Sequence, residues 1–297
     1  MGSTGTTTVI DAARRALGPV GVTLPVSFTT PLSIDLQREA VRRMERVGYH
    51  AVWTNEVIGG KDALVQLAVL LSATERLAFG TSIANIWARQ PQTMHGAAAV
   101  LAQAHPGRFV LGLGSATRSR RPTWARSSAA RWPPCATTWN GWPPDPAARA
   151  RRRRSPDHRR ERSEDAGAGR RDRRRALPPY SPEFTAQARQ VLGPDKLLVV
   201  GLSVVPDSDR DRARAIARER VSAGLGQPSY AAGLTRLGYS DQDIAEVSDR
   251  LVDAIIAHGD PAAIAAKVRE HLTAGADHVT LLSQVGTDFS VGVDQLE

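Results

Sequence analysis

Residues 49–86 read YHAVWTNEVIGGKDALVQLAVLLSATERLAFGTSIANI, in which two short apolar runs flank a longer apolar stretch. We interpret Tyr49–Thr54 and Leu77–Ile86 as strands, because both runs are short, apolar and bounded by polar residues. The stretch between them predicts a helix over Ala63–Ala73, with Asp62 as its N-cap. A strand, a helix and a second strand in this order indicate a parallel βαβ unit.

The same alternation continues on both sides of this unit. Upstream, Gly21–Val26 predicts a strand, and Ile34–Val47 predicts an amphipathic helix that begins after Ser33 and ends at Gly48. The other predicted elements are strands over Phe109–Leu113, Lys196–Val205 and Asp277–Ser283, and helices over Thr93–His105, Pro182–Leu192, Asp209–Val221, Asp249–Ala257 and Pro261–Ala274. In total the sequence predicts four strands before residue 117 and two clear strands after residue 176. An eight-stranded barrel would need about two more strands.

Residues 117–176 break the pattern, because they contain no Leu, Ile, Val, Met, Phe or Tyr. They hold 18 Arg and six acidic residues, a net charge of +12, whereas the whole chain of 297 residues carries +9. The rest of the chain is therefore mildly acidic, and the basic character belongs to this segment alone. The segment also holds four of the six Trp and the single Cys, Cys135.

Three interpretations of residues 117–176 compete. A basic insertion could bind nucleic acid or another polyanion, although the segment contains no Lys. A linker between two domains would tolerate Pro and Arg, but four Trp are unusual in a solvated segment. The third interpretation is translation in a shifted reading frame. Shifted codons for residues 116–142 permit an amphipathic helix, and those for residues 156–175 permit a strand followed by a capped helix. We favour this interpretation, so nucleic acid is not the partner we expect.

Several classes of protein and site do not fit the sequence. A single Cys excludes a disulfide framework and any zinc site built on cysteines, and is typical of a cytoplasmic protein. No apolar run approaches the roughly 20 residues that span a bilayer, and Met1–Thr8 is not typical of a signal peptide. The histidines lack metal-ligand spacing, and there is no HExxH motif, nucleophile elbow or P-loop.

Three motifs carry a family resemblance. They are WTNEVIGGKDAL (Trp53–Leu64), FGTSIANIWARQP (Phe79–Pro91) and PGRFVLGLGSA (Pro106–Ala116). Together they resemble the luciferase-like, F420-dependent oxidoreductases, and most closely an actinobacterial subgroup whose third strand ends in IANIWAR. The tail Ser248–Leu282 is similar to the last helices and strand of that subgroup. The resemblance covers about residues 18–116 and 180–285, and the shifted readings of the middle segment resemble the same family.

The resemblance implies an α/β fold of the TIM (β/α)8 type in a single domain over residues 1–297. Residues 18–116 would form the first four βα units and residues 177–297 the last ones, with the barrel incomplete or disrupted over residues 117–176. The family binds the deazaflavin coenzyme F420 at the carboxyl ends of the strands and transfers a hydride between it and a small organic substrate. Family members are often homodimers. FMN is the alternative cofactor, because related barrels use flavins.

The resemblance also implies the residues of the site. Asn55 and Glu56 would lie near the deazaflavin ring and assist proton transfer; alternatively, Glu56 is a helix-start or surface acid. Arg89 would bind the acidic tail of the coenzyme or pair with a surface acid. The expected cofactor contacts are Thr81, Ser82, Ile83, Ala84, Asn85, Gly112, Gly114 and Ser115, with a non-proline cis peptide bond between Ser82 and Ile83.

Each of these contacts has a structural alternative, namely an ordinary strand end at Thr81–Asn85 and an ordinary glycine turn at Gly112–Ser115. In the family the segment after Ser115 binds the phosphate-bearing tail of the coenzyme, whereas in this chain that segment runs directly into the Arg-rich residues. We therefore expect an F420-dependent oxidoreductase homologue of impaired activity. The alternatives are an FMN-dependent luciferase-like monooxygenase and a basic nucleic-acid-binding protein that uses residues 118–175.

Overall fold

The computed structural model describes residues 4–25, 32–56, 60–114, 181–225, 228–283 and 289–297. Its centre is a seven-stranded sheet in the order β5-β3-β2-β1-β9-β7-β8, in which every pair of neighbouring strands is parallel. The strands are β1 (Val20–Thr23), β2 (Ala51–Thr54), β3 (Ala78–Thr81), β5 (Phe109–Val110), β7 (Val199–Pro206), β8 (Ile256–Gly259) and β9 (His278–Leu282).

A short second sheet continues the first at one end. It pairs β4 (Ala84–Asn85) with β6 (Leu113–Gly114), also in parallel. The predicted strand over Leu77–Ile86 is thus split into β3 and β4, and the predicted strand over Phe109–Leu113 is split into β5 and β6. In both cases the chain bends just beyond the sheet, at the carboxyl ends of the strands.

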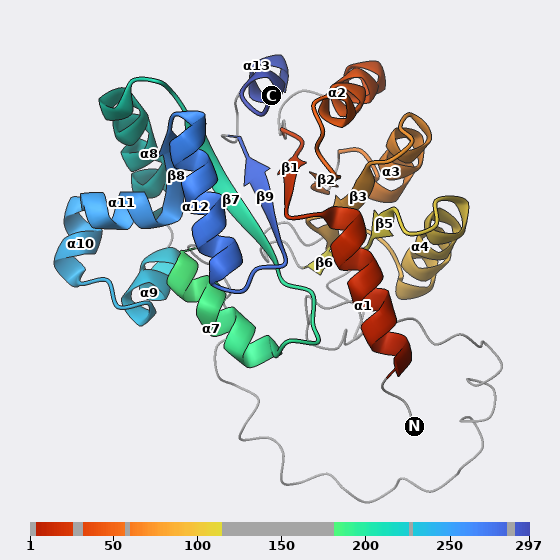
Figure 1. Ribbon diagram of the computed structural model, residues 1–297, viewed down its shortest axis with the longest axis horizontal. Helices are drawn as coiled ribbons and strands as arrows, with labels where there is room; N and C mark the ends of the chain where they lie inside the picture. Colours follow the sequence, from red (N-terminus) through yellow and green to blue (C-terminus); the bar gives the residue numbers. More distant parts are fainter. Residues whose placement is uncertain (1–3, 26–31, 57–59, 115–180, 226–227, 284–288) are drawn as a thin grey trace, which may run out of the picture.

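Helices follow most of the strands, as the βαβ interpretation predicts. In Figure 1, α2, α3 and α4 lie in a row beside β1, β2, β3 and β5, while α8, α11 and α12 surround β7 and β8. The helices are α1 (Thr4–Leu17), α2 (Ile34–Arg46), α3 (Ala63–Ser72), α4 (Pro91–Ala104), α7 (Pro182–Leu192), α8 (Arg210–Leu225), α9 (Pro228–Arg236), α10 (Asp241–Glu246), α11 (Asp249–Ile255), α12 (Pro261–Thr273) and α13 (Phe289–Asp294).

The predicted caps are confirmed. The Ser33 side chain accepts a hydrogen bond from the Asp35 N–H at the start of α2, and Gly48, which follows that helix, has a φ of 95°. The Asp62 carboxylate accepts hydrogen bonds from the N–H groups of Leu64 and Val65 at the start of α3. These side chains satisfy N–H groups that the first turn of a helix leaves without partners.

Apolar side chains fill both faces of the sheet. On one face Val22, Val52 and Phe79 pack against α2, α3 and α4, and on the other Ala51 and Trp53 pack against α1. The Trp53 ring lies so close to Gly80 that a Cβ there would come within 2.3 Å of it, and the ring of His278 leaves a Cβ at Gly21 only 2.8 Å. Glycine at these two strand positions therefore makes room for the two rings.

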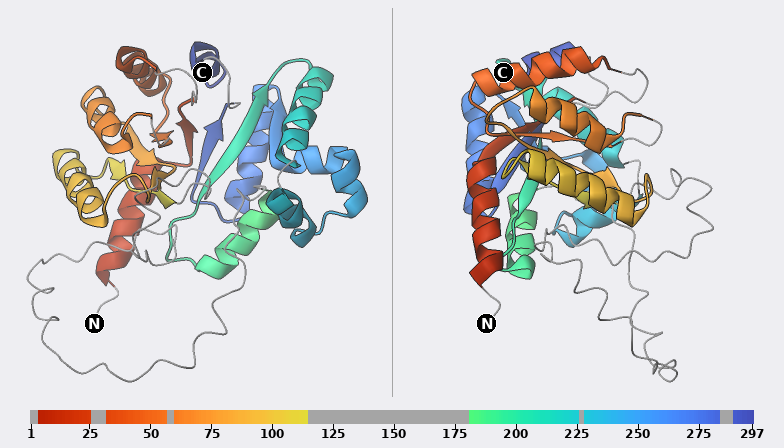
Figure 2. Two further views of the ribbon diagram at one scale, coloured as in Figure 1. Left: turned by 180° about the vertical axis from the view of Figure 1, so that it is seen from behind. Right: turned by 90° about the vertical axis from the view of Figure 1, so that its right-hand side faces the viewer.

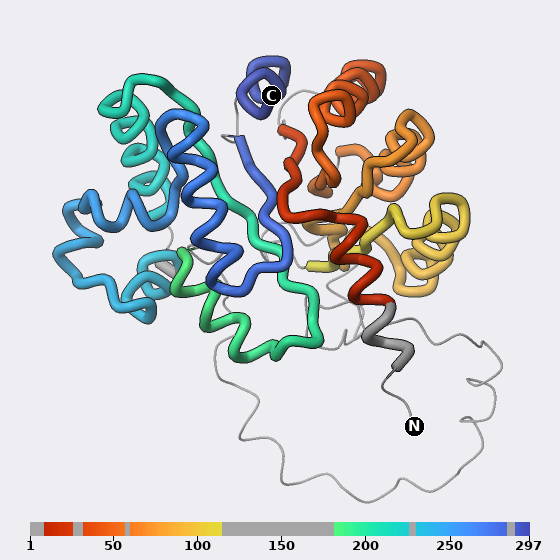
Figure 3. The backbone as a smooth tube through the Cα atoms, in the orientation of Figure 1, coloured from red at the N-terminus to blue at the C-terminus, as the bar shows by residue number. Residues whose placement is uncertain are grey.

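Two halves of the chain meet along β1 and β9, as Figures 2 and 3 show. The strand order of the second half departs from a sequential barrel, because β7 lies between β9 and β8. Helix α12 carries the chain from β8 across β7 to β9 and contacts all three strands. Within the described residues the sheet therefore has two edges, at β5 and at β8. Residues 117–176 lie outside the described part of the chain.

Some expectations for the second half were wrong or incomplete. The predicted helix over Asp249–Ala257 ends at Ile255, and Ile256 begins β8, so three strands rather than two follow residue 176. The β-branched residues Ile255 and Ile256 are buried in a cluster with side chains of α8, α9 and α11, and this tertiary packing overrides the helical spacing before them. Helices α1, α9, α10 and α13 were not predicted.

Candidate functional site

The carboxyl ends of β2, β3 and β5 lie side by side along one edge of the sheet, which is the edge formed by strand ends and not an edge strand. Backbone hydrogen bonds join the segments that follow these three strands. The Ser82 N–H donates to the Thr54 carbonyl at 2.7 Å, and the Glu56 N–H donates to the Ile83 carbonyl at 3.1 Å. The Ala84 N–H donates to the Gly112 carbonyl at 2.8 Å. The structure thus brings together all the site residues predicted from the sequence except Ser115, which lies outside the described residues.

The Ser82–Ile83 peptide bond is cis, which confirms the expectation drawn from the family resemblance. Ser82 is exposed and Ile83 is half-buried, whereas Thr81 and Ala84 on either side are buried. The bend between β3 and β4 therefore presents these two residues at the edge of the sheet while its flanks remain anchored in it.

Glu56 is buried at this edge, with 3% of its side chain exposed, and its two oxygens accept four hydrogen bonds. One oxygen accepts from the Ala63 N–H at 3.2 Å and from Arg89. The other accepts from the Asn85 N–H at 2.7 Å and again from Arg89, at 3.2 Å. The carboxylate thus connects the end of β2 with the first residue of α3 and with β4.

Arg89 completes this cluster. Besides Glu56 it binds the carboxylate of Asp62, the N-cap of α3, at 2.7 Å. Burial opposes the charge of Arg89, but its hydrogen bonds to Glu56 and Asp62 prevail and raise its pKa. Burial likewise opposes the charge of Asp62, and the N–H of Val65 together with Arg89 lowers the pKa of that carboxyl. Of the two roles considered for Arg89, pairing with acids is the one that the structure displays.

Asn85 is fully buried and only partly satisfied. Its side-chain oxygen accepts a hydrogen bond from the Trp87 N–H at 3.0 Å, and its backbone N–H donates to Glu56. Its side-chain nitrogen, Nδ2, is buried and has no hydrogen-bond partner among the residues that the structure describes. A buried donor without a partner is costly, so this atom suits a ligand that brings an acceptor. Asn55, the first residue after β2, is half-buried.

Packing within the protein explains why residues 112 and 114 at this edge are glycine, without any contact to a phosphate group. A Cβ on Gly112 would come within 2.0 Å of the Thr81 carbonyl oxygen, and a Cβ on Gly114 within 2.7 Å of Ile83. The Thr81 hydroxyl donates to the Gly112 carbonyl at 2.8 Å and accepts from the Gly112 N–H at 2.9 Å. Close approach of two chain segments therefore requires glycine here. A close contact with a ligand remains a proposal.

Two of the histidines, which lack metal-ligand spacing in the sequence, are buried structural residues. His278 accepts a hydrogen bond from the Trp53 indole at 3.0 Å and contacts the Gly18 carbonyl at 2.8 Å, and His271 is hydrogen-bonded to Thr185 at 2.9 Å. Burial lowers the pKa of each imidazole to about 4, so both are neutral at pH 7. Within the described residues no group of three His, Cys, Asp or Glu side chains could hold a metal ion.

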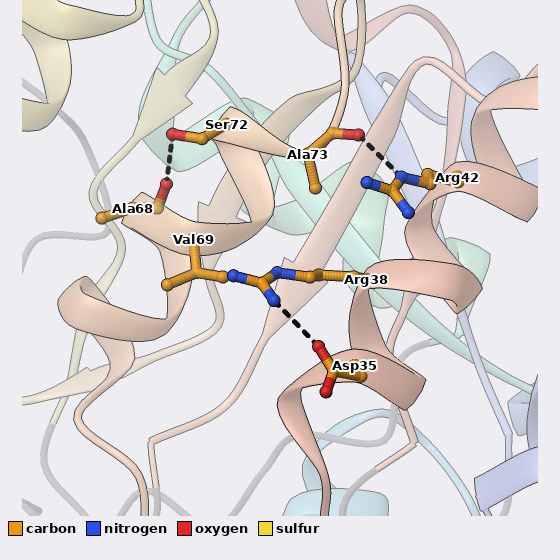
Figure 4. Close-up of a pocket in the computed structure, with 7 residues that line it drawn as sticks. All are labelled: Asp35, Arg38, Arg42, Ala68, Val69, Ser72 and Ala73. Atoms are coloured by element: carbon orange, nitrogen blue, oxygen red, sulfur yellow. Dashed lines mark hydrogen bonds and ion pairs between the residues drawn. The ribbon is translucent and has the colours of Figure 1, made fainter.

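The groove between α2 and α3, shown in Figure 4, lies away from this edge. It has a volume of about 540 Å³ and is lined by Asp35, Arg38, Arg42 and Ser72, among others. All four side chains already have partners, because Arg38 pairs with Asp35, Arg42 donates to the Ala73 carbonyl and Ser72 donates to the Ala68 carbonyl. No helix of the described part is both long and apolar enough to span a membrane.

Comparison with known proteins supports the resemblance. The family model described as luciferase-like monooxygenase matches residues 19–133, which is less than half of the chain. No curated protein sequence matches the chain.

Solved structures match over nearly the whole chain. An F420-dependent secondary alcohol dehydrogenase in complex with an F420-acetone adduct superposes with a TM-score of 0.55 at 14% identity, covering 94% of this chain and 96% of its own. The coenzyme F420 dependent tetrahydromethanopterin reductase from Methanopyrus kandleri gives 0.55 at 16% identity, covering 94% and 97%.

A third similar structure binds a different cofactor. It is the oxygenating constituent of 3,6-diketocamphane monooxygenase from the CAM plasmid of Pseudomonas putida, in complex with FMN. It gives a TM-score of 0.56 at 11% identity and covers 94% of this chain and 96% of its own. At these identities the matches establish the fold alone. The chain therefore has the α/β barrel-type fold of these F420- and FMN-dependent enzymes.

Proposed function

We propose that this chain is a luciferase-like oxidoreductase that binds coenzyme F420 at the carboxyl ends of β2, β3 and β5. The observation that carries the proposal is the convergence of Thr54–Glu56, Thr81–Asn85 and Gly112–Gly114 around the buried, unpartnered amide nitrogen of Asn85. This placement fits the rule that barrel enzymes work at the carboxyl ends of their strands.

The described residues fit the ring portion of such a coenzyme. A deazaflavin ring offers carbonyl oxygens as acceptors, and Asn85 Nδ2 is a donor in need of one. Ser82 and Ile83 would contact the ring from the bend, and Gly112 and Gly114 would add backbone contacts. Arg89 is committed to two carboxylates, so we do not assign it to the acidic tail. Once bound, the coenzyme supplies hydride-transfer chemistry.

The substrate would lie on the open side of the same edge. Asn55 is half-buried one residue before the committed Glu56, and we propose that it orients the reacting group of a small organic substrate. Such a residue contributes by position and hydrogen bonding, because a carboxamide side chain does not act as an acid or a base near neutral pH.

FMN is the second candidate cofactor, favoured by the FMN-bound structure that shares the fold. Both cofactors have a fused ring with carbonyl acceptors, so the same donor could serve either. The two proposals differ in reaction, because F420 carries hydrides whereas a flavin monooxygenase uses oxygen.

Low activity of this chain is part of the proposal. The described sheet has edges at β5 and β8, and the sequence between residues 117 and 176 lacks the apolar residues of a buried strand. We propose that out-of-frame translation replaced the units that would have closed the barrel. The nucleotide sequence tests this point, since insertions or deletions near codons 116, 143–155 and 176–179 should restore the family's elements.

Binding is tested by titrating the full chain into F420 and, separately, into FMN, while the fluorescence of each cofactor is followed. We expect saturable binding of F420, about tenfold weaker in Asn85→Ala and unchanged in Ser72→Ala, whose side chain lies in the groove of Figure 4. Stronger binding of FMN would favour the monooxygenase. Binding of neither, together with salt-dependent binding of nucleic acid that is lost on deleting residues 118–175, would favour the nucleic-acid-binding alternative.

A further inference from the structure

We propose that Glu56 and Arg89 form a buried positioning pair that holds Asn85 in place, and that Glu56 is not the proton-transfer group of the site. The inference rests on the proposed function for its functional consequence, but its geometry stands on the described residues alone. It reassigns the acid that the sequence made the first catalytic candidate.

The first step is that the Glu56 carboxylate has no capacity left for a substrate. A carboxylate offers about four acceptor positions, and Ala63, Asn85 and Arg89 occupy them with two hydrogen bonds on each oxygen. A general base needs a free lone pair within hydrogen-bond reach of the proton that it removes. With only 3% of the side chain exposed, Glu56 offers neither a free lone pair nor access.

The second step is that the pair links three segments through side chains, in addition to the backbone hydrogen bonds that join the loops after β2 and β3. Glu56 follows β2, Ala63 begins α3, and Asn85 lies in β4. Arg89 extends the link to Asp62 and contacts the sulfur of Met94 in α4 at 3.6 Å. The cluster therefore spans the loops after two strands and the starts of two helices.

The third step connects the Glu56–Arg89 pair to Asn85 Nδ2, the atom proposed to bind the ligand. The backbone N–H of Asn85 is bound by Glu56, and its side-chain oxygen is bound by the Trp87 N–H. The Asn85 carbonyl accepts from the Ala88 N–H at 3.0 Å, so these three hydrogen bonds leave only Nδ2 without a partner and fix its direction. A donor that is held before the ligand arrives binds it without a further ordering cost. Loss of Glu56 or Arg89 should therefore weaken cofactor binding.

The experiment uses Glu56→Gln, Arg89→Gln and the double variant in the full chain, with Glu39→Gln as the matched control. Glu39 pairs with Arg46 at 2.9 Å, but both side chains are about three-fifths exposed, so the same chemical change should have no effect there. Arg89→Gln leaves the buried charge of Glu56 without its partner, and Glu56→Gln leaves Arg89 with Asp62 alone, whereas the double variant leaves no buried charge. The fold-change in amide exchange and in F420 affinity in the double variant should therefore be smaller than the product of the two single fold-changes.

Two readouts separate this inference from the proposed function. Hydrogen exchange of the Asn85 and Ala63 amides, relative to the Val22 amide in the sheet, should accelerate at least tenfold in each single variant and less in the double. If F420 binds, its affinity should fall in the same order, and the pH profile of turnover should keep its shape.

Unchanged protection of both amides in Glu56→Gln would overturn the proposal, whether or not the chain binds a cofactor. Loss of one limb of the pH profile with unchanged F420 affinity would also overturn it and would restore Glu56 as a proton-transfer group. Failure of F420 to bind the parent chain, with the amide pattern as expected, would refute the proposed function and leave the positioning pair intact. If a single variant does not fold, the double variant decides through the same two amides.

Discussion

The two ends of the parallel strands use polar groups in opposite ways. At the amino ends, Arg14 of α1 and Arg189 of α7 both bind Asp277, which precedes β9, and both also donate to backbone carbonyls. At the carboxyl ends, the buried side chains of Thr54, Asn85 and Ser283 each have a polar atom without a partner among the described residues. At the first end His271 Nε2 is also buried without a partner among the described residues, but the charged groups there are paired, whereas the second end keeps more unused hydrogen-bonding capacity.

This difference separates stability from function within one sheet. In barrel enzymes the amino ends of the strands serve stability, whereas the carboxyl ends carry the site. Helix α1 lies against the amino ends of β2 and β3, where Ile10 and Leu17 cover Ala51 and Ala78. Changes at the amino end should therefore alter the free energy of unfolding, and changes around Asn85 should alter binding.

Removing the largest side chain beneath α1 should have the largest effect. Trp53→Ala deletes a ring that is 3% exposed, fills the space above Gly80 and binds His278. Loss of a buried Trp costs about 3–5 kcal/mol, and this site should lie near 4 kcal/mol. Urea unfolding followed by circular dichroism measures it, with Leu36→Ala, which is 51% exposed, as the control. A loss below about 1 kcal/mol would mean that α1 does not close this end.

Acid should lower the free energy of unfolding through His278 at the amino end. Burial lowers the pKa of His278 from an ordinary 6.5 to about 4. The unfolded chain therefore binds a proton that the folded chain does not, and stability present above pH 6.5 is lost as the pH falls towards 4. The loss attributable to this residue is on the order of 3 kcal/mol, since one pKa unit corresponds to about 1.4 kcal/mol.

Unfolding free energies measured between pH 7.5 and 4.5, in the chain and in His278→Gln, isolate this contribution, because His271 is common to both. The slope with pH should be shallower in the variant. Equal slopes would show that His278 is accessible to protons in the folded chain and that the amino end is less closed than its contacts indicate.

Loss of the ion pairs that Asp277 forms with Arg14 and Arg189 should have an intermediate effect on the free energy of unfolding. Asp277→Asn leaves Arg14 and Arg189 facing a neutral amide, and it weakens the hydrogen bond from the Leu198 N–H, now 2.7 Å. Breaking a buried ion pair costs about 3–5 kcal/mol, but both arginines are partly exposed, so we expect about 2 kcal/mol. Thermal unfolding should show this loss at low and high salt alike. A loss that disappears in 1 M salt would contradict the closed arrangement.

The sequence predicted the first half of the fold well because its signals are local. Asp62 and Ser33 mark helix starts, and short apolar runs mark β1, β2 and β3, so neither depends on distant contacts. Strand β8 was missed because Ile256–Gly259 follows a helix without a turn residue, and it is a strand through its pairing with β7 and its packing against α8 and α12. The position of β7 between β9 and β8 depends on pairing alone and has no local signal.

The site shows the same division between local and long-range information. The motifs predicted which segments meet, and the structure brings Glu56, Ser82, Asn85 and Gly112 to one edge. The motifs did not predict that Arg89 would pair with Glu56 and occupy its oxygens, since this depends on how two loops 33 residues apart are folded. An acid and an arginine that follow neighbouring parallel strands could have suggested such a pair, because both loops leave the same edge of the sheet.

The smallest effect on stability is expected at Asn85, at the carboxyl ends of the strands. Asn85→Ala removes the unpartnered Nδ2 together with the oxygen that caps the Trp87 N–H. The loss of that hydrogen bond and the relief of an unpaired buried donor act in opposite directions, so stability should change by less than about 1 kcal/mol. Affinity for F420 should fall about tenfold, or about 1.4 kcal/mol. Asn85→Asp keeps the oxygen and replaces the donor, so it should bind at least as weakly. A variant that loses several kcal/mol of stability and no affinity would place Asn85 with Asp277, among the groups that close the sheet rather than those that bind.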